Sequence, residues 1–261
     1  MSAETAMPGG APTLDAFLGG RVALIQPPSG HRAGLDAALL QALVPAASSG
    51  HAIDLGAGVG TAGFAAAARA PALSVVGIER DPDLVALGDA ALQRPENAAF
   101  AARARLLCGD AADGPALREA IGLGVRGVDW VLMNPPFNAA ERMRPSPHAA
   151  RRAAHLAADG LIAAWCATAA LLLKHGGRLG LIHRAAALPE VLAALSGRFG
   201  DIRLLPVRAA AGDAAIRIVI RARRGRRTPL ALLPGLTLHQ PDGSWTREAE
   251  AILRGEAELA M

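Results

Sequence analysis

The chain has 261 residues, about the size of one large domain, and 52% of them are apolar while 19% are charged, which excludes a disordered chain. The net charge is +4, and Lys174 is the only lysine among the 27 basic residues, so the balance fits a nucleic-acid partner without requiring one. Cys108 and Cys166 lie far apart without a Cys-x-x-Cys pattern, which predicts neither a disulfide framework nor a zinc site.

The sequence also shows no signal for a membrane span or for export. The longest notable charge-free apolar stretch, 161–173, has 13 residues, whereas a membrane span needs about 20. No basic flank precedes an apolar run at the N-terminus, which argues against a secretory signal. We therefore expect a cytoplasmic protein with no bound metal and no membrane partner.

The first 48 residues precede the main pattern. Residues 1–12 contain little that could pack, and we expect a disordered leader. A turn and a short strand are predicted within 17–25, and apolar spacing predicts a helix over 34–43. We expect 13–48 to form a cover segment that packs on the main domain.

Residues 49–261 alternate between short apolar strands and helical patterns and are predicted to form the main domain with a C-terminal tail. Strands are predicted at 52–55, 74–78, 105–108, 128–133 and 178–182, helices at 61–70, 82–92, 115–121, 154–173 and 189–195, and two closing strands at 201–206 and 215–221. This alternation predicts a Rossmann-like, doubly wound α/β fold. Its mostly parallel seven-stranded sheet would carry helices on both faces and an antiparallel strand near the C-terminal end.

Glycines and acids follow the first three strands of this region. The first strand runs into residues 54–60, Asp-Leu-Gly-Ala-Gly-Val-Gly, and glycines there let the backbone approach a ligand closely. Asp54, Glu79 and Asp110 come at successive strand ends, which meet at one edge of a parallel sheet. Singly, Asp54 could orient loop amides, Glu79 could pair with an arginine and Asp110 could cap a helix, but three together predict a ligand site.

The same loop admits a second interpretation. Residues 58–63, Gly-Val-Gly-Thr-Ala-Gly, also match the dinucleotide fingerprint, which leaves an NAD-dependent oxidoreductase as an alternative. Asp54 would place a negative charge close to the pyrophosphate of NAD. A ligand with a ribose, an adenine and a cationic amino-acid end suits the three acids better.

The fourth strand ends in Asn134-Pro135-Pro136-Phe137. Consecutive prolines fix the backbone, so the amide oxygen of Asn134 and the carbonyl of Pro135 should face one direction. Two such acceptors can receive both hydrogens of an exocyclic amine and aim its lone pair at an electrophile. Phe137 could then stack on the flat group that carries the amine.

These motifs resemble the class I S-adenosylmethionine-dependent methyltransferases that methylate amines. Within that class, the segments 30–40 and 238–246 make the chain similar to the bacterial tRNA(Val) adenine-N6-methyltransferase family. The resemblance runs from about residue 17 to the C-terminus. It implies S-adenosyl-L-methionine as cofactor and an adenine amine in tRNA as acceptor.

The resemblance also implies roles for single residues. The catalytic residues would be Asn134, Pro135 and Phe137, and the cofactor-binding residues would be Asp54, Gly56, Ala57, Gly58, Glu79, Asp110 and Asn134. Of these, Glu79 would hold the ribose and Asp110 the adenine. Arg32 and Asp36 would belong to the cover near the cofactor, with a surface arginine and a helix cap as the alternative. Many relatives have tyrosine where this chain has Phe137.

Other acceptors remain open. A glutamine of a protein, guanine in rRNA or a small molecule would use the same chemistry, although release-factor enzymes normally carry an N-terminal helical domain and only about 50 residues precede the glycine loop here. A non-catalytic RNA-binding module is a further alternative. Two groups of arginines could neutralise RNA phosphates or could be solvated surface. Six of these arginines lie within 217–227 and four within 142–152.

Overall fold

The computed structural model describes residues 10–28, 34–122, 127–137 and 149–261, and only the backbone for 149–159. Most of the expected leader, residues 1–9, lies outside the described residues, as do Arg32 and residues 138–148.

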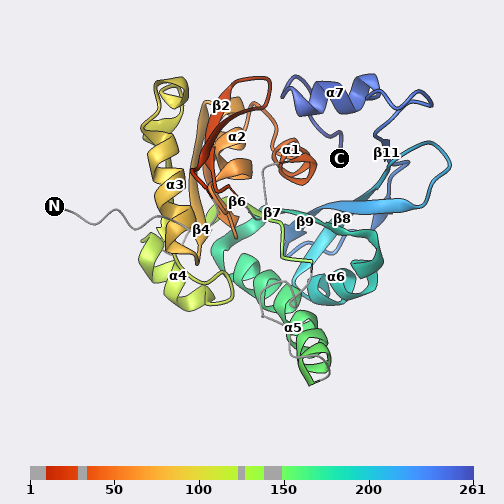
Figure 1. Ribbon diagram of the computed structural model, residues 1–261. Coiled ribbons are helices and arrows are strands. Elements are labelled where there is room, and N and C mark those ends of the chain that lie inside the picture. The colour runs from red at the N-terminus through yellow and green to blue at the C-terminus, as the bar shows by residue number, and fades with distance from the viewer. Residues whose placement is uncertain (1–9, 29–33, 123–126, 138–148) are drawn as a thin grey trace.

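Seven long strands form one sheet, which confirms the predicted fold (Figure 1). In chain order they are β3 (Ser49–Leu55), β4 (Ala72–Glu79), β5 (Ala104–Cys108), β6 (Val128–Met133), β7 (Leu173–Arg184), β8 (Phe199–Arg208) and β9 (Ala215–Arg224). They lie in the order β8-β9-β7-β6-β3-β4-β5, and only β9 is antiparallel to its neighbours. Two short strands, β10 (Ala231–Leu232) and β11 (Leu236–Thr237), extend the edge at β8.

Helices cover both faces of the sheet because successive strand residues face two separate hydrophobic cores. Ala52 belongs to one core and Ile53 to the other. The first core is closed by α1 (Leu35–Gln41), α2 (Thr61–Arg69), α3 (Pro82–Leu92) and α7 (Arg247–Leu253), and the second by α4 (Gly114–Ile121), α5 (Ala149–Leu172) and α6 (Leu188–Leu195). Asp81 and Asp113 accept hydrogen bonds from the first turns of α3 and α4, and these caps explain where both helices begin.

The N-terminal segment forms a hairpin, where the sequence predicted one short strand. Strands β1 (Thr13–Phe17) and β2 (Val22–Gln26) pair antiparallel. Gly19 and Gly20 at the turn have φ of +65° and +87°, a conformation that favours glycine. Apolar residues of β2 and α1 belong to the same core as residues of β3 and β6, so the segment shares its packing with the sheet.

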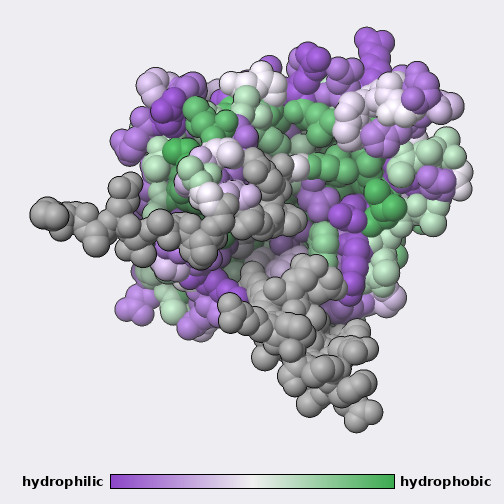
Figure 2. All heavy atoms as spheres, in the orientation of Figure 1, coloured by the Kyte–Doolittle hydropathy of each residue, from purple (hydrophilic) through white to green (hydrophobic). Residues whose placement is uncertain are grey.

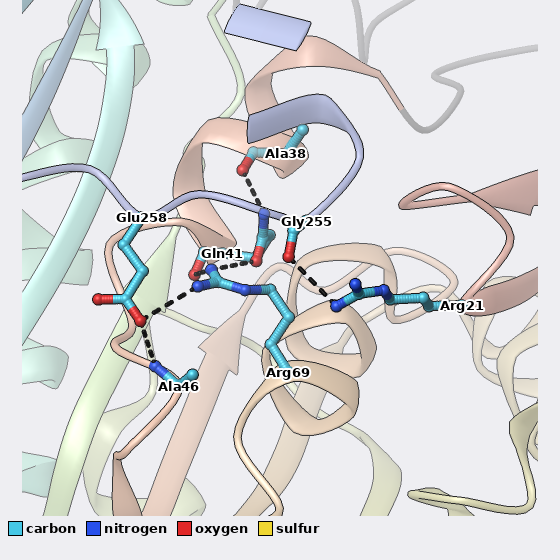
Figure 3. A network of polar contacts seen from close by, with 7 residues as sticks. All are labelled: Arg21, Ala38, Gln41, Ala46, Arg69, Gly255 and Glu258. Atoms are coloured by element: carbon cyan, nitrogen blue, oxygen red, sulfur yellow. Dashed lines mark hydrogen bonds and ion pairs between the residues drawn. The ribbon is translucent and has the colours of Figure 1, made fainter. Parts of the chain in front are cut away.

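The C-terminal tail is fixed to this segment and to α2 by polar contacts (Figure 3). Arg69 of α2 donates to the side-chain oxygen of Gln41 at 2.9 Å and lies 3.4 Å from the carboxylate of Glu258. The same carboxylate accepts from the amide of Ala46, and Arg21 donates to the carbonyl of Gly255. Segments from both ends of the described chain therefore meet on α2.

In this view, hydrophobic residues gather on the surface in the region between α1, β8 and β11, while hydrophilic residues dominate the rim (Figure 2). Among the described residues, no helix combines the length and apolar character needed to cross a bilayer.

Candidate active site

The predicted site residues converge at the carboxyl edge of the sheet. Leu55 at the end of β3 pairs with Ile78 of β4 on one side and with Met133 of β6 on the other. Gly56, Glu79 and Asn134 are the next residues on these three neighbouring strands. The strand register thus brings together motifs that are up to 78 residues apart in the chain (134 minus 56).

The glycine loop turns tightly and is bonded to β4. Gly56, Gly58 and Gly60 have φ of +71°, +58° and +92°. The amides of Gly56 and Ala57 both donate to the carbonyl of Ile78, at 2.8 and 2.9 Å. The amide of Gly58 donates to Glu79 and that of Gly60 to the carbonyl of Ala57. Because these four amides already have partners inside the protein, they are not free to bind a pyrophosphate, which argues against a dinucleotide.

Glu79 is held rigidly at the end of β4. One carboxylate oxygen accepts from the amides of Arg80 and Asp81, at 2.9 and 3.0 Å, and the other accepts from Gly58 at 3.0 Å. The residue is only 6% exposed. Three amides occupy three of the roughly four acceptor positions of a carboxylate, so one position, on the oxygen bonded to Gly58, stays available for a ribose hydroxyl.

A cleft opens beside Glu79. Its lining residues come from the ends of β3, β4 and β5 and from α5: Gly56, Ile78, Glu79, Arg80, Gly109, Asp110, Ala111, Ala112, Leu161 and Trp165. Asp110 is exposed there, and its side chain accepts from the amide of Ala112 at 2.9 Å. A larger hollow lies at the opposite edge of the sheet, but none of the predicted site residues lines it.

Trp165 is a cleft residue that the sequence analysis did not identify. It lies on α5 and is 4% exposed, and a β-carbon added to Gly56 would approach its ring to 2.3 Å. The indole N–H has no hydrogen-bond partner among the described residues. A tryptophan inside a long apolar helix has no sequence signal that separates a cleft residue from a core residue.

Asp54 lies behind the glycine loop. Its side chain is 3% exposed and accepts from the amide of Gly63 in the first turn of α2, at 2.8 Å. Burial, with the nearby Glu79 carboxylate, raises the pKa of Asp54 to about 7. This geometry favours the alternative in which Asp54 orients loop amides, and a direct contact with the cofactor stays a prediction.

We expect Asp54→Asn to remove part of the pH dependence of stability. The pKa of Asp54 lies above its unfolded value of 3.8, so its contribution to stability is present below that value and is lost as the pH rises towards 7. About three pKa units correspond to at most about 4 kcal/mol. Urea unfolding at pH 5 and pH 8 should show the variant to be more stable than the wild type at pH 8. Asp89→Asn, at an exposed position of α3, is the matched control, and an unchanged pH dependence in Asp54→Asn would contradict the assignment.

The Asn-Pro-Pro-Phe loop follows β6 next to the glycine loop. The side-chain oxygen of Asn134 is buried and has no hydrogen-bond partner among the described residues. Pro135 is buried, which fits a fixed bend. A buried acceptor without a partner is costly, by about 1–3 kcal/mol, unless a ligand supplies the donor.

Phe137 is contacted by side chains from two other strands. The guanidinium of Arg217 on β9 lies 4.7 Å from the centre of its ring, and the imidazole of His183 on β7 lies 4.9 Å from it at 74°. Arg217 is in turn paired with Asp36 of α1, at 3.0 and 3.2 Å to its two oxygens. Asp36 thus lies beside the Asn-Pro-Pro-Phe loop, and the guanidinium of Arg217 already covers part of the Phe137 ring.

The arginines of 217–227 do not form one patch at the site. Successive residues of β9 point to opposite faces, and the strand runs from Arg217 at the carboxyl edge of the parallel strands towards their amino edge. Arg223 donates to the carbonyl of Gly176, and Arg224 donates to that of Leu173. The four arginines within 142–152 lie outside the residues whose side chains the structure describes.

Comparison with known proteins defines the family. Residues 32–207 match the model of the methyltransferase small domain. The chain belongs to this family. A structure from Agrobacterium tumefaciens, described as a predicted O-methyltransferase, is 30% identical and has a TM-score of 0.74, with 87% of this chain and 99% of that chain covered. No curated protein matches the sequence.

Two more distant structures share the fold. The 16S rRNA N2 G1207 methyltransferase RsmC of Thermus thermophilus, solved with AdoMet and guanosine, is 21% identical with a TM-score of 0.55, and 85% of this chain and 53% of that chain are covered. TrmN of the same organism is 21% identical with a TM-score of 0.51, and 72% and 48% are covered. The present chain spans about half the length of these two proteins.

The family confirms S-adenosyl-L-methionine as the cofactor and excludes the NAD-dependent alternative. The residues of the cleft fit it: the carboxylate of Glu79 suits a ribose hydroxyl, and that of Asp110 suits an adenine amine. When bound, S-adenosyl-L-methionine supplies a methyl group on a positively charged sulfur. Asn134 directly follows β6, the strand next to β3, and its role in orienting the accepting group stays a prediction.

Proposed function

We propose that this methyltransferase modifies an exocyclic amine of a nucleobase, with adenine in tRNA as the first candidate, in the cytoplasm. One observation carries the proposal: the buried, unpartnered side-chain oxygen of Asn134, at the end of the strand next to the glycine loop. An amide oxygen accepts hydrogen bonds and does not remove protons at neutral pH. It therefore suits an amine, whose nitrogen needs orientation before it reacts and can release a proton to water afterwards.

Each residue has a defined task in this proposal. Asn134 and the carbonyl of Pro135 accept the two amine hydrogens, which directs the nitrogen lone pair towards the cofactor side of the site. Phe137, which Arg217 holds in place, contacts the flat base. Glu79 and Asp110 orient the cofactor by its ribose and adenine. Positioning of this kind, together with electrostatics, accounts for most of the rate enhancement in such a displacement.

A nucleic-acid acceptor is supported by the fold neighbours and by the charge. RsmC, described as an rRNA guanine methyltransferase, is among the structures that share the fold. The chain carries 27 basic and 23 acidic residues. Guanine in rRNA, a protein glutamine and a small molecule are the alternative acceptors of the same chemistry.

Methylation of a hydroxyl is the second candidate function, because the 30% identical structure is described as a predicted O-methyltransferase. A hydroxyl reacts slowly unless a base removes its proton. His183 is the histidine in contact with Phe137, and burial lowers its pKa to about 4, which makes it a weak base. This observation favours an amine acceptor.

The proposal is tested by identifying the methylated product. Total tRNA and rRNA from a strain that lacks the gene would be incubated with the protein and labelled S-adenosyl-L-methionine, followed by nucleoside mass spectrometry. We expect N6-methyladenosine in tRNA. N2-methylguanosine in rRNA would move the acceptor to guanine. An O-methylated nucleoside, or no labelled nucleic acid, would contradict the proposal.

A further inference from the structure

His183 lies on the side of the Asn-Pro-Pro-Phe loop that faces away from the glycine loop. In the sheet, β6 lies between β3, which leads into the glycine loop, and β7, which carries His183 (Figure 1). Leu181 of β7 pairs with Met133, the last residue of β6, so His183 extends two residues beyond that level. Asn134 is therefore flanked by the glycine loop, which follows β3, and by His183 on β7.

The imidazole of His183 is buried and neutral, and the described residues satisfy its hydrogen-bonding groups poorly. The residue is 2% exposed, and neither ring nitrogen makes a hydrogen bond of normal geometry with a described residue. Burial and the positive charges of Arg184 and Arg217 lower its pKa to about 4, although the nearby backbone of Arg184 partly opposes them. At neutral pH the ring thus offers one donor and one acceptor. Buried polar groups nearly always have partners, and here a bound ligand can provide them.

The ring is also fixed in place. Its contact with Phe137 is steep, at 74°, and Phe137 is itself covered by Arg217, which Asp36 holds from α1. On the neighbouring strand β9, Ile218 pairs with His183 and belongs to the hydrophobic core on that face. A polar group held so rigidly among apolar and aromatic neighbours is suited to recognising one arrangement of donors and acceptors.

We propose that His183 determines acceptor specificity by forming hydrogen bonds with the edge of the heterocycle whose amine Asn134 holds. The ligand class is a planar nitrogen heterocycle with a ring acceptor close to its exocyclic amine. This inference rests on the proposed function and extends it, because it names the residue that distinguishes one base from another. Asp36 and Arg217 act as positioning residues for Phe137.

Two substitutions test the role of His183 in the acceptor reaction. His183→Leu removes both nitrogens, while His183→Gln keeps a donor and an acceptor. With tRNA as acceptor, we expect His183→Leu to lower kcat/KM at least tenfold through a higher KM, and His183→Gln to recover part of the loss. Affinity for S-adenosylhomocysteine should stay within twofold in both. His175→Leu, at an exposed position of the same strand, is the matched control and should change none of these values.

The melting temperature separates binding from a structural role. Leucine leaves no buried polar atom unpaired, so His183→Leu should keep or raise the Tm of the free protein. A fall in Tm that parallels the fall in activity, and that His183→Gln does not relieve, would overturn the inference.

A probe independent of methyl transfer is adenosine 5′-monophosphate, titrated into the complex with S-adenosylhomocysteine. We expect the imidazole nitrogen resonances that disappear in His183→Leu to shift in the wild type. A shift without methylation of any RNA would refute the proposed function and leave His183 as a contact for a nucleotide-sized acceptor. Methylation of tRNA with neither a shift nor a change in KM would overturn this inference alone, and no response to either probe would overturn both.

Discussion

Replacing Asn134 by alanine should lower the rate of methyl transfer by about 10²–10³-fold, the usual effect of removing one hydrogen-bonding group from a preorganised site. The side-chain oxygen of Asn134 is buried and has no partner among the described residues, so the substitution breaks no hydrogen bond of this oxygen within that part of the protein. The loss should therefore appear in kcat. Single-turnover transfer to tRNA measures the chemical step, and calorimetry with S-adenosylhomocysteine measures cofactor affinity, which should stay within twofold.

Asn134→Asp provides the matched comparison for this variant. Aspartate keeps oxygen acceptors at the same place and a side chain of the same size, so it should retain more activity than alanine. Full activity in Asn134→Ala would refute the role of the side chain. Equal loss of activity and of cofactor affinity would instead show that Asn134 holds the cofactor rather than the acceptor.

Much of the sheet could be predicted from the sequence because strands β3 to β6 are short apolar runs that end near a glycine, a proline or an acid. Runs such as 52–55 and 128–133 correspond closely to β3 and β6. The position of β9 between β7 and β8 could not be predicted, since strand order depends on pairing between distant segments. The hairpin strand β1 was also missed: it has only five residues, and Leu14, one of its apolar residues, is exposed.

The cofactor side of the site was predictable because its residues follow consecutive strands. Gly56 and Glu79 could be placed together from the rule that parallel strands end at one edge, and the register confirms that placement. The sequence could not decide whether Asp54 faces the ligand or the loop. The hydrogen bond from Gly63 favours the loop.

The acceptor side was less predictable because its contacts cross the fold. Phe137 was singled out, but His183 and Arg217 come from strands that are 46 and 80 residues further along the chain (183 and 217 minus 137). The sequence also left open what the arginine-rich segment does. In the structure, the alternation of β9 places Arg217 beside Phe137 and gives Arg224 a contact with the backbone of Leu173.

Gly56→Ala should destabilise the protein and prevent cofactor binding, because two separate costs meet at this position. The residue has φ of +71°, where a side chain costs about 1–2 kcal/mol. Its β-carbon would also lie 2.3 Å from the ring of Trp165, which is 4% exposed and cannot move without displacing its neighbours. Overpacking of this kind costs about 1–3 kcal/mol. Urea unfolding should show a loss of roughly 3 kcal/mol for the two effects together.

Gly197→Ala separates the two costs. Gly197 has φ of +75°, is exposed, and has nothing within 4 Å of an added β-carbon, so this control carries only the backbone cost. Gly56→Ala should exceed it by the overpacking cost, and Trp165→Val in the Gly56→Ala background should recover part of that difference. Because Gly56 and Trp165 both line the cleft, only Gly56→Ala should lose affinity for S-adenosylhomocysteine. Equal effects of the two glycine substitutions on stability and affinity would show that Trp165 does not confine the glycine loop.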